Sequence, residues 1–230
     1  MIKRARKAAT ARPTRRESAD DGVQVISLPR LFLYHRGLED AVRDGVTVLT
    51  SEELAVRVGR GISSTQVRKD LSRLGALGRR GQGYGVVALM RKLARLLGLD
   101  RDWRIVIVGF GYLGHALATF LEYREEKFHI GGIFDTDTTL VGSRWHGVRI
   151  SHADDLEKVL PALECSMGIV TVPSTAAQQV ADRLARCGIG AILNFAPTTL
   201  KLPARVAVRT IDLASELSIL THHLKRGVRE

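Results

Sequence analysis

The sequence has few cysteines and no long apolar run, and each absence excludes a class of protein. Only two of its 230 residues are cysteines, Cys165 and Cys187, and neither lies in a C-x-x-C or histidine-ligand spacing. This argues against a disulfide scaffold and against a metal site, and it favours a reducing compartment with both thiols buried as small apolar groups. No stretch reaches the ~18 consecutive apolar residues of a membrane span, so we expect no membrane.

The first residues, "MIKRARKAATARPTRRES", are basic but lack the apolar core of a signal peptide. We therefore expect no export and a cytoplasmic protein. Residues 1–22 contain almost no large apolar group, so too little surface can be buried to offset the entropy of ordering them. We predict that they form a disordered basic arm.

Negative charge is scarce in the first part of the chain. Residues 1–98 hold 20 lysines and arginines against 9 aspartates and glutamates, whereas residues 99–230 hold 15 of each. The net charge of +11 therefore lies entirely before residue 99. A concentrated basic field attracts polyanions such as DNA, although a solvated face that only aids solubility would have the same charge.

Two helical patterns open the basic part of the chain, which we assign to a domain at residues 23–98. Apolar residues at Leu31, Leu38 and Val42 recur at helical spacing and predict a first helix. In "TSEELAVRVG", Thr50 and Glu53 have the spacing of a capping box, which predicts a second, short helix.

A third helix and a hairpin complete a DNA-binding pattern. Ser63 and Gln66 again have capping-box spacing, and Val67, Leu71 and Leu74 form one apolar stripe. The glycine-rich "GALGRRGQGYGV" then predicts a tight basic hairpin, and a last helix follows it. This order is typical of a winged helix-turn-helix that reads DNA, though such shapes also serve protein contacts. The predicted DNA contacts are Thr65, Gln66, Arg68, Lys69, Arg79 and Arg80.

Short apolar runs alternate with helical stretches in the neutral part, residues 99–209. The runs are "RIVIVGF", "FHIGGIFD", "VRI", "MGIVTVP" and "AILNF". Strands that alternate with helices predict right-handed crossovers and a parallel sheet, with ligands at the carboxyl ends of the strands. We therefore predict an α/β chain in which the winged helix is joined to a Rossmann-like domain.

The stretch "VIVGFGYLGHALATF" contains the G-x-G-x-x-G spacing of a dinucleotide site. Gly109 would permit the turn, Gly111 would let a pyrophosphate approach the backbone, and Gly114 would let helix pack on strand. Asp135 ends the next strand, where a carboxylate accepts both ribose hydroxyls and repels a 2′-phosphate. This favours NAD(H) over NADP(H), unless Asp135 merely caps a turn.

Two later strand ends, "TVPS" and "NFAP", would line the rest of the cofactor groove, or would be plain turns around proline. The predicted cofactor contacts are Gly109, Gly111, Tyr112, Leu113, Gly114, Asp135, Thr171, Val172, Pro173 and Asn194.

No catalytic constellation accompanies this site. His115 is expected on the helix surface, and the adjacent His222 and His223 cannot share one helix face. The chain has no second domain to hold a substrate, so we predict that it is not an enzyme. Residues 210–230 predict an amphipathic helix with a leucine stripe that needs a partner, which suggests a homodimer.

The sequence also resembles the redox-sensing transcriptional repressor Rex family over about residues 25–225. The matching stretches are "STQVRKDLS", "GRRGQGYGV", "VGFGYLG", "IFDTD", "TVPSTAAQQVADRL", "GAILNFAP" and "IDLASEL". The resemblance implies homodimers with a winged helix, a Rossmann domain and a C-terminal helix swapped between subunits. It also implies binding to operator DNA of fermentation and respiration genes, and release from it by NADH.

The resemblance further implies a switch. Arg36 and Asp212 match the charged pair that links the DNA domain to the cofactor domain in this family. The family usually has a tyrosine where this chain has Phe120, and an aromatic pair where it has Arg73 and Leu74. We expect Phe120 to line an apolar pocket between subunits that accepts neutral reduced nicotinamide better than charged NAD⁺.

We therefore predict a dimeric, NAD(H)-responsive repressor that binds double-stranded operator DNA and holds no metal. Two alternatives stay open. The first is an NAD-dependent oxidoreductase with an accessory basic domain. The second is a DNA-bound scaffold whose Rossmann domain has lost its nucleotide.

Overall fold

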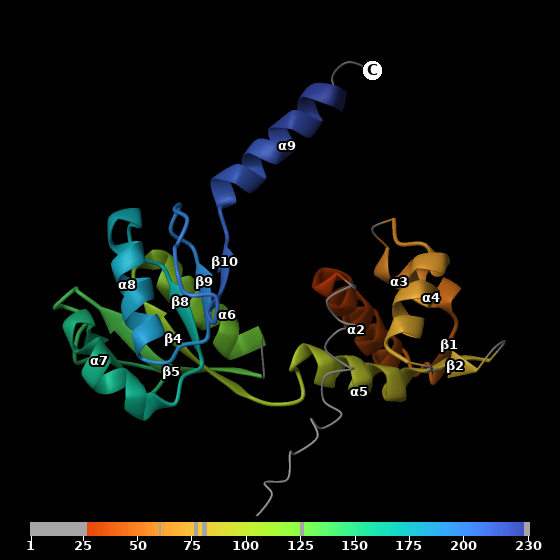
Figure 1. Ribbon diagram of the computed structural model, residues 1–230, viewed down its shortest axis with the longest axis horizontal. Coiled ribbons are helices and arrows are strands. Elements are labelled where there is room, and N and C mark those ends of the chain that lie inside the picture. Colours follow the sequence, from red (N-terminus) through yellow and green to blue (C-terminus); the bar gives the residue numbers. More distant parts are fainter. Residues whose placement is uncertain (1–26, 60, 76–77, 80–81, 125–126, 228–230) are drawn as a thin grey trace, which may run out of the picture. The chain divides into compact units, whose positions relative to one another are not determined.

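The computed structural model describes residues 27–59, 61–75, 78–79, 82–124 and 127–227. The chain divides into two compact units, Met1–Asp100 and Arg101–Glu230, which are described separately (Figure 1). The predicted arm at residues 1–22 lies outside the described residues, and so does Arg80. In the part of the chain that is described, none of the helices could cross a bilayer, because none is both long and apolar enough.

In its described residues, the first unit contains four helices and a small antiparallel sheet. The helices are α2 (Leu28–Arg43), α3 (Ser51–Val58), α4 (Ser64–Arg73) and α5 (Val86–Leu97). The strands β1 (Val48–Leu49), β2 (Gly78–Arg79) and β3 (Gly83–Gly85) pair in the order β1-β3-β2. The hairpin β2–β3 follows α4, which is the predicted arrangement of a winged helix-turn-helix.

Helix starts in this unit follow the capping prediction only in part. At α3 the capping box is complete, because Thr50 accepts from the Glu53 amide and Glu53 accepts from the Thr50 amide. At α4 the Ser63 hydroxyl accepts from the Gln66 amide at 3.2 Å, but the Gln66 side chain turns to Asp70 instead. The second capping box was therefore predicted wrongly, because a buried carboxylate one turn later competes for the Gln66 amide group.

Two of the three apolar residues whose spacing predicted α2 belong to the core of the first unit. Leu31 and Leu38 are fully buried, but Val42 is 41% exposed. Tyr34 and Ala41 are buried on α2 instead, and α5 packs along this helix. The predicted helix is confirmed, and its buried face follows Leu31, Tyr34, Leu38 and Ala41 rather than Val42.

The second unit is built on a seven-stranded sheet in the order β10-β9-β8-β4-β5-β7-β6. Its parallel strands are β4 (Trp103–Val108), β5 (Phe128–Asp135), β7 (Val148–His152), β8 (Met167–Val170), β9 (Ala191–Asn194) and β10 (Ala207–Thr210), and β6 (Arg144–Trp145) is antiparallel. Its helices are α6 (Tyr112–Arg124), α7 (Leu156–Val159), α8 (Ser174–Arg186) and α9 (Leu213–Gly227), with 3₁₀ turns at Ala153–Asp155 and Leu160–Leu163. The Rossmann-like prediction is confirmed.

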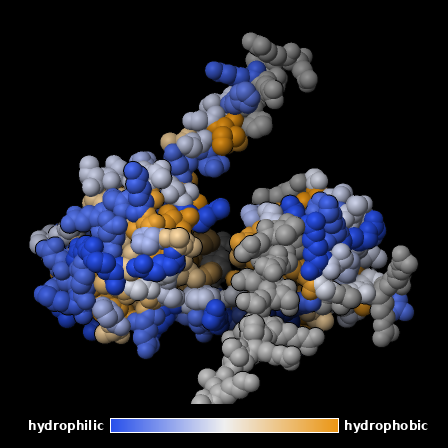
Figure 2. Space-filling view, viewed as in Figure 1, coloured by the Kyte–Doolittle hydropathy of each residue, from blue (hydrophilic) through white to orange (hydrophobic). Residues whose placement is uncertain are grey.

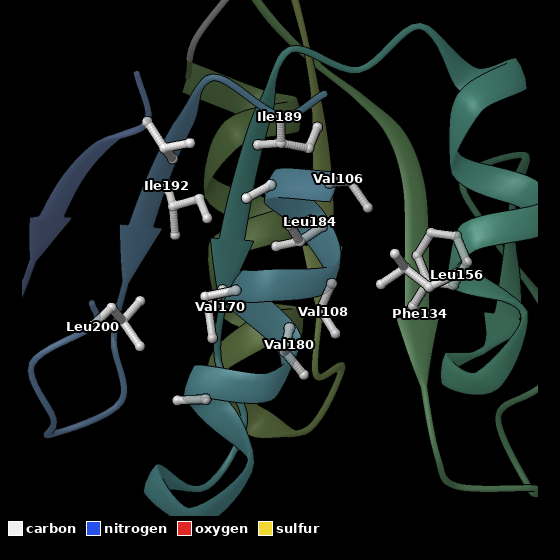
Figure 3. Packing of buried hydrophobic residues seen from close by; sticks show 14 of the residues in the cluster. Val106, Val108, Phe134, Leu156, Val170, Val180, Leu184, Ile189, Ile192 and Leu200 are labelled. Carbon is white, nitrogen blue, oxygen red and sulfur yellow. The ribbon is translucent and has the colours of Figure 1, made fainter. Parts of the chain in front are cut away.

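Side chains of β4 alternate between two apolar layers, as the period of a strand requires. Val106 and Val108 pack against α7 and α8, whereas Ile105 and Ile107 pack with α6 on the other face. Figure 3 shows Val180 and Leu184 of α8 directed at the first of these layers. Because both faces of β4 are covered, the strand is buried and its carboxyl end is held in a fixed place.

The last helix, α9, exposes its leucine stripe. The stripe consists of Leu213, Leu217, Leu220 and Leu224, and each of these side chains is more than half exposed. Figure 2 shows the apolar surface on this helix. Exposing four leucine side chains to water costs free energy. The leucine stripe of α9 is therefore typical of a helix that packs in an interface, not of one that stays in solvent.

Candidate functional site

The glycine loop after β4 passes closely between β8 and α6. Gly109 has φ of 93°, and a Cβ placed on it would lie 2.7 Å from the Thr171 carbonyl oxygen. A Cβ on Gly114 would lie 2.0 Å from the Gly109 carbonyl oxygen. Both positions therefore require glycine, one for its backbone conformation and for space, the other for space alone.

Gly111 differs from its two neighbours in the motif. A Cβ there would meet nothing within 4 Å, so the backbone faces open space just before α6 begins. The first amides of α6 have no partner within the helix and carry its positive dipole end. Tyr112 and Leu113 are exposed beside this opening. The loop thus has the features of a diphosphate site.

Asp135 lies at the carboxyl end of β5, the strand beside β4. One carboxylate oxygen accepts from the Phe110 backbone amide, and the other accepts from the Asp137 amide at 2.8 Å. These bonds fix the carboxylate against the glycine loop and leave each oxygen a second lone pair. The tie to Phe110 was not predicted, because only the pairing of β4 with β5 brings these distant residues together.

The loop after β8 faces the same opening. The Thr171 hydroxyl donates to the Gly109 carbonyl at 2.6 Å, so it holds the glycine loop. Val172 is half-buried and lies against Gly109, whereas Pro173 is exposed and precedes α8. The main role of Thr171 is therefore to hold the glycine loop in place, rather than to contact a ligand directly.

Asn194 was predicted to contact the cofactor, but the structure gives it another role. The residue is fully buried. Its Nδ2 donates to the carbonyls of Ala196 and Thr198, at 3.0 and 2.9 Å, and its Oδ1 accepts from the Ala196 amide. The amide group is thus engaged inside the turn after β9, and the reading of "NFAP" as turn chemistry fits better.

These pieces meet at one place in the sheet. From β4 the chain continues to β5 on one side and later to β8 on the other, so the strand order reverses at β4. Ligands of open α/β sheets bind in the crevice at such a switch point. The open backbone at Gly111, the dipole of α6 and the fixed Asp135 carboxylate fit the diphosphate and ribose of a dinucleotide.

In the part of the chain that the structure describes, this crevice shows no arrangement of catalytic groups. His115 is exposed, as predicted, and its ring packs beside Phe110 with 5.4 Å between centroids. Among the described residues, no three histidine, cysteine or acidic side chains gather where they could hold a metal ion. Burial raises the pKa of both thiols, Cys165 and Cys187, which leaves them protonated and unreactive at neutral pH.

The second candidate site is the exposed surface of α4 in the first unit. Thr65, Arg68 and Lys69 are exposed there. The Arg68 guanidinium is paired with Glu52 of α3 at 2.9 Å, a contact that the sequence pattern did not indicate. Arg79 lies on β2 of the hairpin.

Gln66 is only half exposed because it belongs to a buried cluster around Asp70. The Asp70 carboxylate is fully buried and accepts from Arg30, Tyr34 and Gln66. Burial alone would raise its pKa, but hydrogen bonds from these three side chains lower it overall. The cluster joins α4 to α2, and it leaves Gln66 one amide hydrogen and its oxygen for an outside partner.

Of the predicted switch residues, Arg36 lies in the first unit, and Phe120 and Asp212 lie in the second. Arg36 is exposed on α2, and Phe120 is 52% exposed on α6. The Asp212 carboxylate caps α9, since it accepts from the Ala214 and Ser215 amides at 3.0 and 3.2 Å and from the Ser215 hydroxyl. Sequence reasoning missed this capping role, although an Asp before an apolar helix is its usual signal.

Comparison with known proteins assigns the chain to a family. The model of a putative DNA-binding protein N-terminus matches residues 23–72, and the model of a CoA binding domain matches residues 100–198. A redox-sensing transcriptional repressor Rex of Streptomyces avermitilis is 41% identical over 222 residues, covering 96% of this chain and 87% of that protein. The Rex of Carboxydothermus hydrogenoformans is 42% identical over 200 residues, covering 87% and 95%. The chain belongs to the Rex family.

Solved structures agree with this assignment. RSP, a Rex-family repressor, in complex with β-NAD⁺ and operator DNA is 33% identical, with a TM-score of 0.82 over 88% of this chain and 94% of that one. RSP in complex with β-NADH is 32% identical, with a TM-score of 0.77 over 88% and 96%. Rex-family proteins are transcription regulators, so the oxidoreductase alternative does not hold.

Proposed function

We propose that this chain is a transcriptional repressor that binds operator DNA through its first unit and leaves it when NADH binds to the second. One observation carries this proposal: a chain about 40% identical to Rex repressors over nearly its whole length retains both a winged helix and an intact dinucleotide crevice. The scaffold alternative, a Rossmann domain without its ligand, conflicts with the open Gly111 and the fixed Asp135.

The residues of the crevice divide the dinucleotide between them. The open backbone at Gly111 and the first amides of α6 would hold the diphosphate, and Asp135 would accept the ribose hydroxyls of the adenosine. A bound NAD(H) supplies a nicotinamide ring whose charge depends on its redox state. A 2′-phosphate would meet the negative charge of Asp135, which favours NAD(H) over NADP(H).

Titration with NADH, followed by its fluorescence, tests this half of the proposal. We expect Asp135→Asn to weaken NADH binding by roughly tenfold and to narrow the preference over NADPH, because charged hydrogen bonds to the ribose are lost. Asp137→Asn is the matched control, because it removes the same charge only two residues from Asp135. The Asp137 carboxylate bonds to Thr139 within its own turn. Equal effects of both variants would contradict the ribose assignment.

The DNA half rests on the exposed cations of α4. In a winged helix the second helix of the pair lies in the major groove, and basic groups beside it contact phosphates. We expect Arg68→Ala and Lys69→Ala each to weaken DNA binding, and Lys69→Ala to reduce the salt slope by about one through its lost phosphate contact. If both variants bind DNA as tightly as the wild type at each of two salt concentrations, this placement of α4 is contradicted.

The exposed stripe on α9 supports a homodimer in which this helix is exchanged. A second copy of the chain is the partner with a matching surface, because a two-fold interface joins like to like. Replacing Leu217 and Leu220 by Ser should yield monomers in sedimentation and weaken operator binding, whereas Ser218→Ala on the same helix should leave both unchanged.

A repressor acts where its operator lies, so we place this one in the cytoplasm.

The switch requires that NADH bind the DNA-free arrangement of the dimer more tightly than the DNA-bound one. Phe120 is half exposed in the single chain, so any pocket it lines would be closed by the second copy. Neutral reduced nicotinamide enters such an apolar pocket more easily than the charged ring of NAD⁺. Arg36 and Asp212 would then transmit closure between cofactor and DNA domains.

A further inference from the structure

One carboxylate holds the arginine that we assign to DNA reading. Glu52, in the first turn of α3, accepts from a terminal nitrogen of Arg68 at 2.9 Å. The other terminal nitrogen of Arg68 lies 3.4 Å from the Thr65 hydroxyl on the same helix. The guanidinium is therefore oriented from two sides before any DNA arrives.

Glu52 is negatively charged at neutral pH. A hydrogen bond with its own backbone lowers the pKa of this carboxyl most. The charge of Arg68 and hydrogen bonds from Ser64 and Arg68 lower this pKa further. Both partners remain more than half exposed, at 54% for Arg68 and 60% for Glu52. An exposed ion pair of this kind contributes little to folding, so its main consequence is where it places charge and the guanidinium fork.

The position of Glu52 bears directly on DNA. In a helix-turn-helix the first helix crosses the phosphate backbone while the N-terminal part of the second meets base edges. A carboxylate at the start of α3 repels phosphates, so it opposes the approach of a phosphate to the neighbouring Arg68. Guanine differs because it carries no net charge: its O6 and N7 can accept from the outer edge of a guanidinium whose other edge stays on Glu52, without repulsion by that carboxylate.

We propose that Glu52 is a specificity-determining residue, which holds Arg68 in the orientation that reads guanine and disfavours its pairing with phosphates of non-operator DNA. This inference rests on the DNA-binding function proposed above. Lys69 provides the contrast on the same helix. It forms no ion pair with another described residue, and its compact charge suits a contact that ignores sequence.

The test compares two DNA duplexes. One is selected from a randomised library by the wild-type full-length protein, and the other is a scrambled duplex of the same composition. We expect Glu52→Gln to tighten binding to the scrambled duplex, to raise its salt slope, and to lower the ratio of selected to scrambled affinity by roughly tenfold. Asp40→Asn is the matched control, because it removes the same charge from an exposed ion pair, with Arg43, that involves no residue of α4.

A second background shows whether Glu52 acts through Arg68. In Arg68→Ala protein, Glu52→Gln should no longer change the ratio, because the side chain that it orients is gone. The inference is overturned if Glu52→Gln lowers the ratio of selected to scrambled affinity equally in the Arg68→Ala background. It is also overturned if Asp40→Asn lowers that ratio as much as Glu52→Gln does, because only a general charge effect then remains. If the wild-type protein selects no sequence at all, the proposed DNA-binding function fails, and the inference fails with it.

Discussion

The Thr171 hydroxyl donates a hydrogen bond of 2.6 Å to the Gly109 carbonyl, and this contact ties the end of β8 to the loop that follows β4. The same carbonyl lies where a Cβ on Gly114 would have to be. One carbonyl therefore fixes the loop from both sides, by a hydrogen bond from β8 and by close packing against α6. The shape of the dinucleotide site depends on this point.

Removing the hydroxyl should loosen the loop. We expect Thr171→Val to weaken NADH binding about fivefold, because a hydrogen bond of this kind contributes about 1 kcal/mol and its loss leaves the loop less ordered. Thr171→Ser keeps the hydroxyl and should bind nearly as the wild type does. Fluorescence titration of NADH measures both, and weakening by Thr171→Ser as large as that by Thr171→Val would contradict the role given to the hydroxyl.

Two glycines of the motif should respond differently to the same methyl group. Gly114→Ala places a Cβ against backbone, so α6 or the loop must shift, and we expect a loss of about 1–3 kcal/mol in stability together with cofactor affinity. Gly111→Ala meets no protein atom, so its fold should persist while NADH binding falls. Thermal unfolding followed by tryptophan fluorescence reports on this unit, since both tryptophans, Trp103 and Trp145, belong to it. A stable Gly114→Ala protein would contradict the packing argument.

The buried Asp70 should make the first unit sensitive to acid. Its pKa is lowered in the folded state, so its contribution to stability is present above the ordinary aspartate value of about 3.9 and is lost as the pH falls through the lowered value. We expect Asp70→Asn to cost roughly 2–4 kcal/mol at neutral pH, because Arg30 loses its charged partner, and the difference from wild type to shrink below about pH 4.

Hydrogen exchange of peptides from α2 and α4 measures this loss, with α8 peptides as the internal reference. Tyr34→Phe removes only one of the hydrogen bonds to Asp70 and should cost about 1 kcal/mol. A difference between Asp70→Asn and wild type that stays constant from pH 3 to pH 6 would rule out the ionised carboxylate as the cause.

Asp212 has two roles that substitutions can separate. Asn also caps helices well, so Asp212→Asn keeps the start of α9 while it removes the charge proposed to pair with Arg36. Asp212→Ala removes both. If pairing matters, Asp212→Asn and Arg36→Ala should weaken the NADH response equally in an operator-release assay. A normal response of Asp212→Asn with a defect in Asp212→Ala would assign the effect to capping and α9 alone.

The architecture could be predicted from the sequence because local patterns indicate the elements of each unit. The glycine motif, the strand that ends in Asp135 and the capping box at Thr50 and Glu53 all depend on residues close in the chain. The missed contacts join distant residues: Glu52 with Arg68, and Phe110 with Asp135. No local spacing marks them, and only the packing of α3 on α4 and of β4 beside β5 creates them.

Asn194 and Val42 show what a local pattern leaves open. Each fits a pattern, a polar strand end or an apolar helix position, but burial decided their roles. Asn194 lies inside a turn whose carbonyls it satisfies, and Val42 lies beyond the point where α2 still faces its core. A pattern gives the element, whereas the side of the element that is covered depends on the neighbours it meets.

Operator release by the two redox forms of the cofactor tests the central claim most directly. A duplex selected by the protein is titrated in an electrophoretic shift assay with NADH and, separately, with NAD⁺. We predict release by NADH at concentrations that leave the complex with NAD⁺ almost intact, and a stronger NADH response in Phe120→Tyr, whose hydroxyl can add a hydrogen bond in the closed pocket. Equal release by both cofactors, or by neither, would contradict the account.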